Sequence, residues 1–344
     1  MVKVIIVGSG FMGQTHGAAY KNMEQVQVVA ICDKNVEKGV KFSEEFFCTY
    51  YESCEAALEK EDIDVVDICL PTFLHEKYVL LAAYYKKHIF CEKPVTLSLE
   101  SLDRMISAAE VAGVEFYVGQ VVRFWPEYQE AKKMYTDRLD EIKSVYCARL
   151  SEHPKWSDWY KQVDSSGGGL FDLHLHDIDY LCYLLGKVKS VYAVGKKNTY
   201  ECWNHVTSIL NFENGISATV EGIIDMAVGY PFTMVLRLVS ENQVFDFEMK
   251  AGSNLENVAD AKRNTYLYIN TGESKKLEIE MKNAYQIELK HFISCINEGK
   301  KSDIISTESV RNVMCTILAI QKSLETHQEV MVDYKGVGVI ETRI

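Results

Sequence analysis

The chain has 344 residues, a length typical of two domains, and its 47% hydrophobic and 25% charged residues are typical of a globular protein. Its net charge of −12 disfavours binding to nucleic-acid phosphates, and no apolar run reaches the roughly 18 residues that a membrane span needs. The apolar residues 1–7 predict a strand and not a leader peptide. We therefore expect a cytoplasmic protein that has neither a nucleic-acid nor a membrane partner.

The ten cysteines are scattered through predicted strands and helices, and no Cys-x-x-Cys pair occurs among them. Such scattered thiols are typical of reduced, buried cysteines in a reducing compartment.

A short β-branched run, Val4–Val7, leads directly into a glycine-rich turn with the pattern Gly-x-Gly-x-x-Gly. Gly8 permits the tight turn, Gly10 lets a pyrophosphate approach the backbone, and Gly13 lets the following helix pack on the strand. The N-terminus of that helix favours an anion without a cationic side chain. The turn therefore predicts a dinucleotide site, with contacts from Gly8, Ser9, Gly10, Phe11 and Met12.

Asp33 ends the second predicted strand and follows the last glycine by about 20 residues. A carboxylate at this place binds the ribose hydroxyls of NAD and repels the 2′-phosphate of NADP. The neighbouring Lys34 softens that repulsion, so NADP remains the alternative cofactor.

Strands and helices alternate over the first 120 or so residues, which predicts a doubly wound, mostly parallel sheet. The expected strands are 26–32, 63–70, 88–91 and 114–118, and the expected helices are 14–22, 36–46, 54–60, 75–85 and 99–112. Ligands of such sheets lie beyond the carboxyl ends of the strands. Four residues at the end of the strand 63–70 and just after it are therefore candidate cofactor contacts: Leu70, Pro71, Thr72 and His75. His75 has the alternative role of capping the next helix.

The tripeptide Glu92-Lys93-Pro94 follows the next strand, and the proline restricts the backbone of Lys93. A lysine held in this way donates to a substrate oxygen and stabilises negative charge that develops there. The alternative is an ordinary solvated lysine. Glu92 and Lys93 are both candidate contacts of the cofactor.

Arg123 lies where the chain leaves the predicted first domain. A predicted helix over 127–139 and a predicted strand over 145–151 follow it. Arg123 is a candidate substrate ligand, or else it fixes the domain junction. His153, Trp156 and Trp159 lie on one irregular stretch, where aromatic rings can stack on a sugar face. The alternative is that the tryptophans anchor a long loop to the core.

Three glycines, 167–169, precede a predicted helix over 170–185. Asp172 and His176 are four residues apart and share a face of that helix, whereas His174 points elsewhere. An aspartate in this position orients the imidazole and leaves its other nitrogen free for proton exchange with a substrate. A metal site is the rival interpretation, and we expect none because no second ligand-rich segment is apparent.

Strands dominate from residue 188 onward, separated by turn signals typical of antiparallel sheets. The expected strands are 190–196, 206–212, 216–222, 233–239, 243–249, 266–270 and 276–281, and two helices, 285–297 and 307–326, follow them. An open sheet of this size needs helices on one face and has room for a second subunit on the other. We therefore expect a homodimer or homotetramer.

The glycine-rich turn, Asp33, the Pro-Thr-x-x-His stretch, Glu92-Lys93-Pro94 and the run 167–177 together resemble the Gfo/Idh/MocA oxidoreductase family. The resemblance implies a Rossmann domain, placed here at 1–121, and an α+β domain with a large, open, mostly antiparallel sheet at 122–344. It also implies NAD or NADP bound between the domains, and sugars, polyols or related compounds as substrates. Lys93, Asp172 and His176 take the places of the family's catalytic residues.

The expected activity is therefore hydride transfer between a nicotinamide and a hydroxyl or carbonyl carbon. His176 removes the hydroxyl proton, Asp172 orients His176, and Lys93 stabilises the alkoxide. Two alternatives stay open: a glycosidase that uses bound NAD catalytically, and a ligand sensor without activity.

Overall fold

The computed structural model describes residues 1–153, 158–252 and 261–335. Within these ranges the chain forms two compact units. Unit 1 contains Met1–Phe124 and Asn283–Val310, and unit 2 contains Trp125–Lys282 and the segment that begins at Arg311. Residues 283–310 thus group with the N-terminal unit, although the sequence prediction divided the chain once, between 121 and 122. No helix of the described residues is long and apolar enough to cross a bilayer.

Unit 1 is built on a six-stranded parallel sheet in the order β3-β2-β1-β4-β5-β6. This order is that of a Rossmann sheet, whose ligands bind where the strand order reverses. Its strands are β1 (Val2–Val7), β2 (Val26–Cys32), β3 (Thr49–Tyr51), β4 (Val65–Ile68), β5 (His88–Cys91) and β6 (Phe116–Val118).

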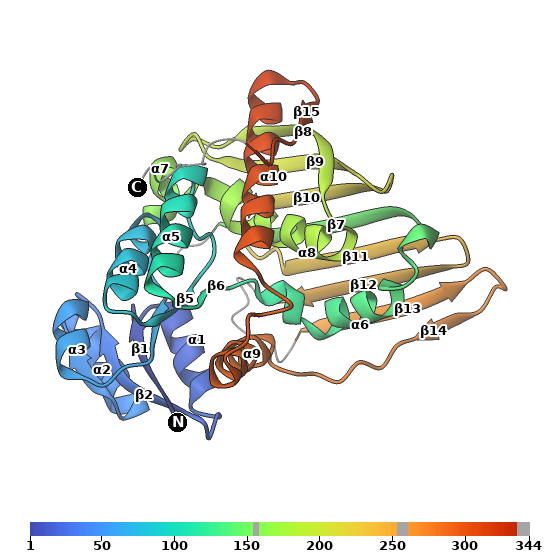
Figure 1. Ribbon diagram of the computed structural model, residues 1–344. Coiled ribbons are helices and arrows are strands. Elements are labelled where there is room, and N and C mark those ends of the chain that lie inside the picture. The colour runs from blue at the N-terminus through green and yellow to red at the C-terminus, as the bar shows by residue number, and fades with distance from the viewer. Residues whose placement is uncertain (154–157, 253–260, 336–344) are drawn as a thin grey trace. The chain divides into compact units, whose positions relative to one another are not determined.

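Helices cover the sheet of unit 1, with α1 packed beside α9 and α4 beside α5 (Figure 1). They are α1 (Phe11–Tyr20), α2 (Val36–Phe46), α3 (Cys54–Lys60), α4 (Thr72–Tyr84), α5 (Leu99–Ala112), the 3₁₀ helix η1 (Val121–Phe124) and α9 (Ala284–Glu298). Polar side chains cap several of them: Asn35, Ser53, Ser98 and Asn283 each accept a backbone N–H of the first turn. Helix α1 has no such side-chain cap, and its first turn has no acidic residue.

Unit 2 is built on a nine-stranded sheet in the order β14-β13-β12-β11-β7-β10-β9-β8-β15. Neighbouring strands are antiparallel except for β7 and β10, which are parallel. The strands are β7 (Ile142–Glu152), β8 (Val188–Lys197), β9 (Trp203–Phe212), β10 (Ser217–Met226), β11 (Phe232–Ser240), β12 (Gln243–Ala251), β13 (Lys262–Ile269), β14 (Ser274–Lys276) and β15 (Val330–Met331).

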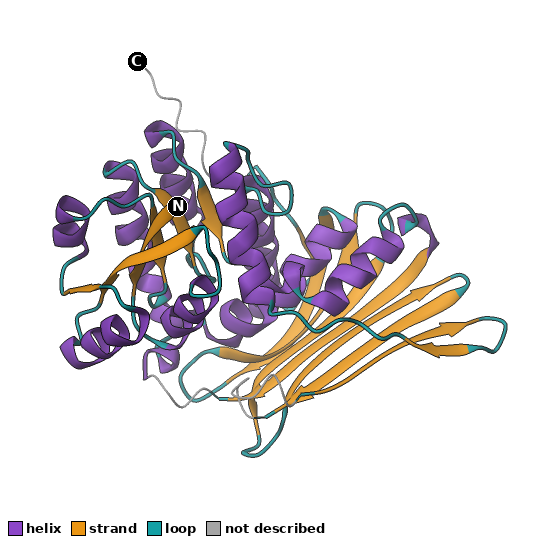
Figure 2. Ribbon diagram, turned by 90° about the horizontal axis from the view of Figure 1, so that it is seen from below, coloured by secondary structure: helices purple, strands orange, loops and turns teal. Residues whose placement is uncertain are grey.

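The helices of unit 2 lie on one face of this sheet (Figure 2). They are α6 (Pro126–Tyr135), the 3₁₀ helices η2 (Leu139–Glu141) and η3 (Asp158–Lys161), α7 (Val163–Ser166), the π-helical turn η4 (Leu170–His174), α8 (Leu175–Leu185) and most of α10 (Thr307–Thr326). Side chains of β9 alternate between the two faces: Val206, Ser208 and Leu210 are buried, whereas His205 and Ile209 are exposed.

The fold class is confirmed, and three local predictions need correction. The predicted strand 276–281 is wrong, because β14 ends at Lys276. The helix predicted from residue 75 begins at Thr72, so His75 lies in its first turn. The helix predicted over 170–185 is a π-helical turn followed by an α-helix.

Candidate functional site

The glycine-rich turn of unit 1 is tightly packed at two glycines and open at the third. Gly8 has φ +103°, and a Cβ there would lie 2.4 Å from the carbonyl oxygen of Cys69. A Cβ on Gly13 would lie 1.9 Å from the carbonyl oxygen of Gly8, so neither position admits a side chain. A Cβ on Gly10 would meet no atom of the described residues within 4 Å. Open space at Gly10, beside the uncapped start of α1, fits a pyrophosphate.

Asp33 is bonded to this turn. Its Oδ2 accepts the backbone N–H of Ser9 at 2.7 Å and the Ser9 hydroxyl at 2.6 Å, and its Oδ1 accepts the N–H of Asn35 at 2.7 Å. The half-buried carboxylate is therefore held at the end of β2, next to the glycine-rich turn. This is the place from which an acid binds the ribose of NAD.

The segment that follows β4 contributes two buried polar residues. His75 is buried, and its Nε2 lies 2.7 Å from the Leu70 carbonyl while its Nδ1 lies 3.2 Å from the Val95 carbonyl. Burial lowers the pKa of His75 despite these acceptors, so the ring stays neutral at pH 7. The buried Oγ1 of Thr72 has no hydrogen-bond partner among the described residues. An unsatisfied hydroxyl at the end of β4 is consistent with a ligand bound there.

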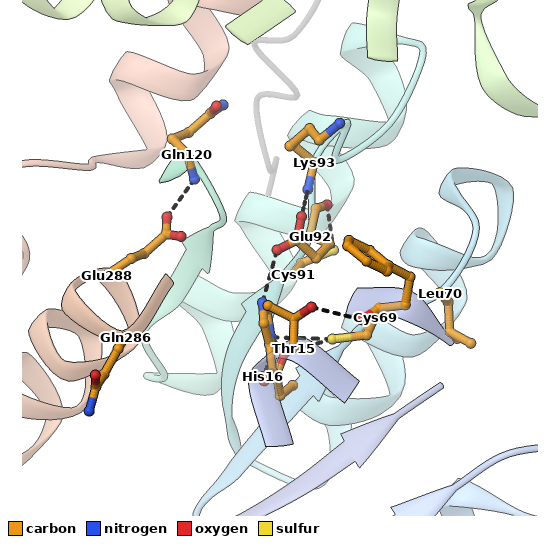
Figure 3. Close-up of polar contacts among 12 residues, drawn as sticks. Thr15, His16, Cys69, Leu70, Cys91, Glu92, Lys93, Gln120, Gln286 and Glu288 are labelled. Atoms are coloured by element: carbon orange, nitrogen blue, oxygen red, sulfur yellow. Dashed lines mark hydrogen bonds and ion pairs between the residues drawn. The ribbon is translucent and has the colours of Figure 1, made fainter. Parts of the chain in front are cut away.

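Lys93 follows β5 in a turn whose other members are buried. Glu92 and Pro94 are buried and Lys93 is half-buried, and the Lys93 N–H donates to Glu92 Oε2 at 3.1 Å (Figure 3).

A buried polar cluster joins α1 to β4 and to the segment that follows β5 (Figure 3). His16 Nδ1 lies 2.9 Å from Asp67 Oδ2 and 3.3 Å from Cys69 Sγ, and His16 Nε2 lies 3.1 Å from Glu92 Oε1. Burial alone would lower the pKa of His16, but the charge of Asp67 and its hydrogen bond raise it well above its ordinary value. Ligand atoms of His16, Asp67 and Cys69 all lie within 4.8 Å of one another. Their separations equal hydrogen-bond lengths, and hydrogen bonds account for them.

In unit 2, Asp172 and His176 lie on the π-helical turn and on the first turn of α8. From Ser166 to Leu181 every residue is buried except these two, which are half-buried. Residues four apart share a side of either helix type, so the carboxylate and the imidazole both reach the accessible side of this segment. Single-turn π-helices are frequent at functional sites.

Buried bonds anchor the helix around this pair. Arg149 of β7 donates to both carboxylate oxygens of Asp177, at 2.8 and 2.9 Å, and both side chains are buried. Although burial opposes it, the charge of Asp177 raises the pKa of Arg149, which stays protonated. The ion pair thereby fixes the residue next to His176.

His174 lies on the other side of the turn. It is fully buried, and its Nε2 lies 2.8 Å from the hydroxyl of Ser208 on β9. Burial, which disfavours the charged form of the ring, lowers the pKa of His174 to about 3. His174 is therefore a neutral structural residue at pH 7.

A series of polar contacts connects His153, through Asp225 and Asn204, to the start of the π-helical turn. His153 Nδ1 lies 2.8 Å from Asp225 Oδ1, Asp225 Oδ2 accepts Asn204 Nδ2 at 2.9 Å, and Asn204 Oδ1 accepts the Gly169 N–H at 2.8 Å. Trp159 stacks on Tyr160 with 4.2 Å between ring centroids. Trp156 lies outside the described residues.

Arg123 is buried in unit 1, and its Nη1 donates to the Ile304 carbonyl at 2.6 Å and to the Ser309 hydroxyl at 3.2 Å. These bonds favour a structural role over contact with a substrate. A role in substrate binding stays a prediction for Arg123 and His153.

Sequence reasoning missed the residues that hold the candidate site in place: His16, Asp67, Arg149, Asp177, Asn204 and Asp225. One signal was available. Asp67 lies inside an otherwise apolar strand, and a buried acid needs a partner. The identity of the partner is not readable from spacing, because His16 is 51 positions away.

Two family models match the chain. Residues 2–120 match the oxidoreductase family model with an NAD-binding Rossmann fold, and residues 128–242 match the GFO/IDH/MocA C-terminal domain. The chain belongs to the Gfo/Idh/MocA oxidoreductase family. The family resemblance inferred from the motifs is thus confirmed, and the residues around Gly10, Asp33 and Thr72 fit the cofactor that the Rossmann model implies.

Relatives in the family carry several different names. The chain is 32% identical over 185 residues to 2,7-anhydro-N-acetylneuraminate hydratase of Mediterraneibacter gnavus, a match that covers 53% of the chain and 48% of the relative. It thus spans about half the length of the first curated relatives that it matches. It is 24% identical to myo-inositol 2-dehydrogenase of Thermotoga maritima over 96% of the chain and 99% of the relative.

The fold agrees with a solved structure described as a putative NADPH-dependent oxidoreductase of Desulfitobacterium hafniense. The TM-score is 0.86, the identity is 23%, and the match covers 96% of this chain and 98% of that one.

Proposed function

We propose that the protein is an NAD(P)-dependent dehydrogenase or reductase that acts on a CH–OH group of a sugar, a polyol or a related small molecule. The observation that carries the proposal is the accessibility of Asp172 and His176 within a helical segment that is otherwise buried. Relatives named for activity on myo-inositol, D-xylose and scyllo-inositol support the substrate class.

The chain's own residues have the following roles in this proposal. The glycine-rich turn and Asp33 hold the dinucleotide, which accepts or donates a hydride at its nicotinamide when bound. His176 takes the proton from the substrate hydroxyl, and Asp172 orients the imidazole and stabilises its charged form. Lys93 donates a hydrogen bond to the same substrate oxygen and stabilises the charge that develops there. In this proposal Lys93 and His176 serve one substrate.

The test is the appearance of NADH, followed by its absorbance, with myo-inositol and with D-xylose as substrates. Lys93→Met and His176→Ala should each lower kcat by about 10²–10⁴-fold, the usual contribution of a proton-transfer or oxyanion-stabilising group. In His176→Ala the Kd of NAD should change less than about threefold, because His176 is not among the expected contacts of the cofactor. Undiminished turnover in either variant would contradict the assignment of that residue.

NAD is the proposed cofactor, because a 2′-phosphate would meet the carboxylate of Asp33 that is already bonded to Ser9. The KM for NADP should therefore exceed that for NAD, and Asp33→Ser should narrow the difference. Equal KM values in the wild type would contradict this part of the proposal.

A second candidate is a reaction without net oxidation. It is favoured by the 32% identity to two relatives named as hydratases of an anhydro sugar acid. Incubation of the NAD-loaded protein with 2,7-anhydro-N-acetylneuraminate separates the two candidates: product formation without accumulated NADH supports this one, and NADH formed from free polyols supports the first.

We also propose that the protein forms a homodimer or a homotetramer through the open face of the large sheet. Outward-facing apolar side chains support it: Tyr192, Val194, Ile209 and Tyr268 are 39%, 48%, 43% and 44% exposed. Light scattering after gel filtration tests the proposal, and a monomer at micromolar concentration would contradict it.

We also propose a cytoplasmic location. The ten free cysteines agree with it, because thiols stay reduced in that compartment.

A further inference from the structure

The imidazole of His16 is in contact with a carboxylate at each of its nitrogens. Asp67 belongs to β4 and Glu92 follows β5, so the ring bridges the ends of two neighbouring strands (Figure 3). The side chain of His16 is fully buried, that of Asp67 is fully buried and that of Glu92 is 7% exposed. The Nδ1 contact with Asp67 is a hydrogen bond, whereas the 3.1 Å contact of Nε2 with Glu92 is an ion pair without hydrogen-bond geometry, and a positively charged ring is attracted to both carboxylates. Two buried carboxylates without a cation would be strongly unfavourable, so the geometry requires the imidazolium.

The other groups that face the ring do not change this conclusion. Cys69 Sγ lies 3.3 Å from Nδ1, and burial raises the pKa of this thiol, which stays protonated. Tyr20 of the same helix and Tyr285 of α9 have ring centroids 6.5 and 6.4 Å from that of His16, and burial likewise keeps the Tyr20 phenol protonated.

Glu92 carries the bridge to Lys93. Its Oε1 contacts His16, while its Oε2 accepts the Lys93 N–H at 3.1 Å. The glycine at position 119 leaves the space that this carboxylate occupies, because a Cβ there would lie 3.0 Å from Glu92 Oε1 and 3.3 Å from its carboxyl carbon. The backbone of Lys93 is thus fixed by a carboxylate that His16 holds in one orientation.

We propose that His16 is a positioning residue for Lys93, acting through Glu92, with Asp67 holding the imidazolium in place. The proposal rests on the proposed function, in which Lys93 contacts the substrate. His16 lies on α1, which begins at the glycine-rich turn, so one side chain connects the cofactor helix to the Lys93 turn. Rigid support of this kind matters because a displacement of about 1 Å at a reacting group can cost about 10²-fold in rate.

The first experiment measures hydrogen exchange and needs no substrate. We compare the wild type with His16→Gln and with His16→Gln/Asp67→Asn, in which the second change removes one of the two uncompensated carboxylates and restores stability. The amide of Lys93 should exchange at least about tenfold faster in both variants. The amide of Ile89 in β5, the strand that precedes Lys93, donates to the Glu115 carbonyl at 2.8 Å; it is the internal control and should not change. Asp62→Asn, which alters an exposed carboxylate, is the control variant. Unchanged protection of Lys93 would overturn the proposal.

The second experiment is kinetic and uses whichever of myo-inositol and D-xylose is turned over. His16→Gln should lower kcat by about 10–100-fold and change the Kd of NAD less than about threefold. In a Lys93→Met background the same change should lower kcat less than about threefold, because its effect passes through Lys93. The double variant His16→Gln/Asp67→Asn should regain thermal stability without regaining kcat. Recovery of both, or an undiminished effect in the Lys93→Met background, would show a merely structural role and overturn the proposal.

The two experiments also separate the failure of this proposal from the failure of the proposed function. If neither polyol yields NADH, the exchange of the Lys93 amide still decides whether His16 positions it. One zinc ion per chain in the purified protein would overturn the bridge, because Nδ1 would then be a metal ligand and not a donor.

Discussion

The chain contains two glycine-rich turns that each lead into a helix, and they differ in what surrounds the glycines. In unit 1 the space around Gly10 is open, and α1 begins without a side-chain cap. In unit 2 a Cβ on Gly168 would lie 2.7 Å from that of Cys202, and the N–H of Gly169 is bonded to Asn204. A glycine pattern alone does not separate the two. At the open turn, the missing side chain of Gly10 leaves space for a ligand. At the closed turn, the missing side chains of Gly168 and Gly169 let the protein's own residues 202–204 pack closely.

The helices that follow the two turns each bury a histidine, with opposite protonation. His16 meets two carboxylates and is charged, whereas His174 meets a serine hydroxyl and is neutral. Burial by itself lowers the pKa of an imidazole. For His16 the charge of Asp67 outweighs burial and the pKa is raised, whereas for His174 burial decides and the pKa is lowered. The comparison predicts how each glycine-rich turn, together with the helix that follows it, responds to mutation.

The largest effect on stability is expected at Arg149, which anchors α8, the helix that follows the closed turn and its π-helical turn. Arg149→Met leaves the buried carboxylate of Asp177 without its cation, with the Tyr128 hydroxyl at 3.4 Å as its remaining described donor, and should lower the free energy of unfolding by about 3–5 kcal/mol in urea denaturation. Arg237→Met is the matched control, because the Arg237–Asp246 pair also joins two groups of unit 2 but has side chains 45% and 26% exposed. It should cost less than about 1 kcal/mol. Equal losses would show that the anchor contributes no more than a surface pair.

The next effect concerns the closed turn itself. Gly168→Ala introduces a Cβ at φ +67° and against Cys202, so we expect a loss of about 2–3 kcal/mol from backbone strain and overpacking together. Gly215→Ala separates the two causes, because Gly215 has φ +87° and its Cβ would meet no described atom within 4 Å. That variant should lose only about 1 kcal/mol, from strain alone. The same loss in both would mean that the turn has room for a side chain.

The third prediction concerns the pH dependence of stability. His174 has a pKa of about 3 in the native state and an ordinary value near 6.5 when unfolded, so between these values the unfolded chain binds the extra proton. The free energy of unfolding therefore falls as the pH drops below 6.5, by about 1.4 kcal/mol per pH unit from this residue. His174→Gln should have a shallower slope between pH 6.5 and 5. Identical slopes would contradict a neutral His174.

The smallest effect on stability is expected at the open turn. Gly10 has φ −70°, which any residue adopts, so Gly10→Ala should change the free energy of unfolding by less than about 1 kcal/mol. The Kd of NAD should nevertheless rise by about tenfold or more, because the new methyl group takes the space of the pyrophosphate. Calorimetric titration measures this, and Gly252→Ala, where a Cβ would likewise meet no described atom within 4 Å, is the control. Unchanged affinity would show that the space is not used by the cofactor.

Local patterns predicted what local chemistry determines. The β-branched run before Gly8, the acid at residue 33 and the alternation of strands and helices all specify short-range structure, and unit 1 has the predicted sheet. Most strands of unit 2 agree within a few residues for the same reason.

The remaining features depend on residues that meet only after folding. The π-helical turn at Leu170–His174 lies against β9 and β10, and the sequence of the turn alone reads as an α-helix. Arg149 and Asp177 are 28 positions apart, and no pattern in the sequence around either residue identifies the other as its partner. Periodicity therefore located Asp172 and His176 but could not locate the residues that hold them.

Helix α9 completes unit 1 from the far end of the chain. The buried carboxylate of Glu288 accepts the Gln120 N–H at 2.6 Å, and Arg123 is bonded to Ile304. During synthesis on the ribosome, the N-terminal unit must therefore wait for more than 150 further residues before its last helix emerges. A truncated chain ending at Phe124 would expose the side of α1 that α9 covers, and we expect it to aggregate unless residues 283–310 are supplied as a separate peptide.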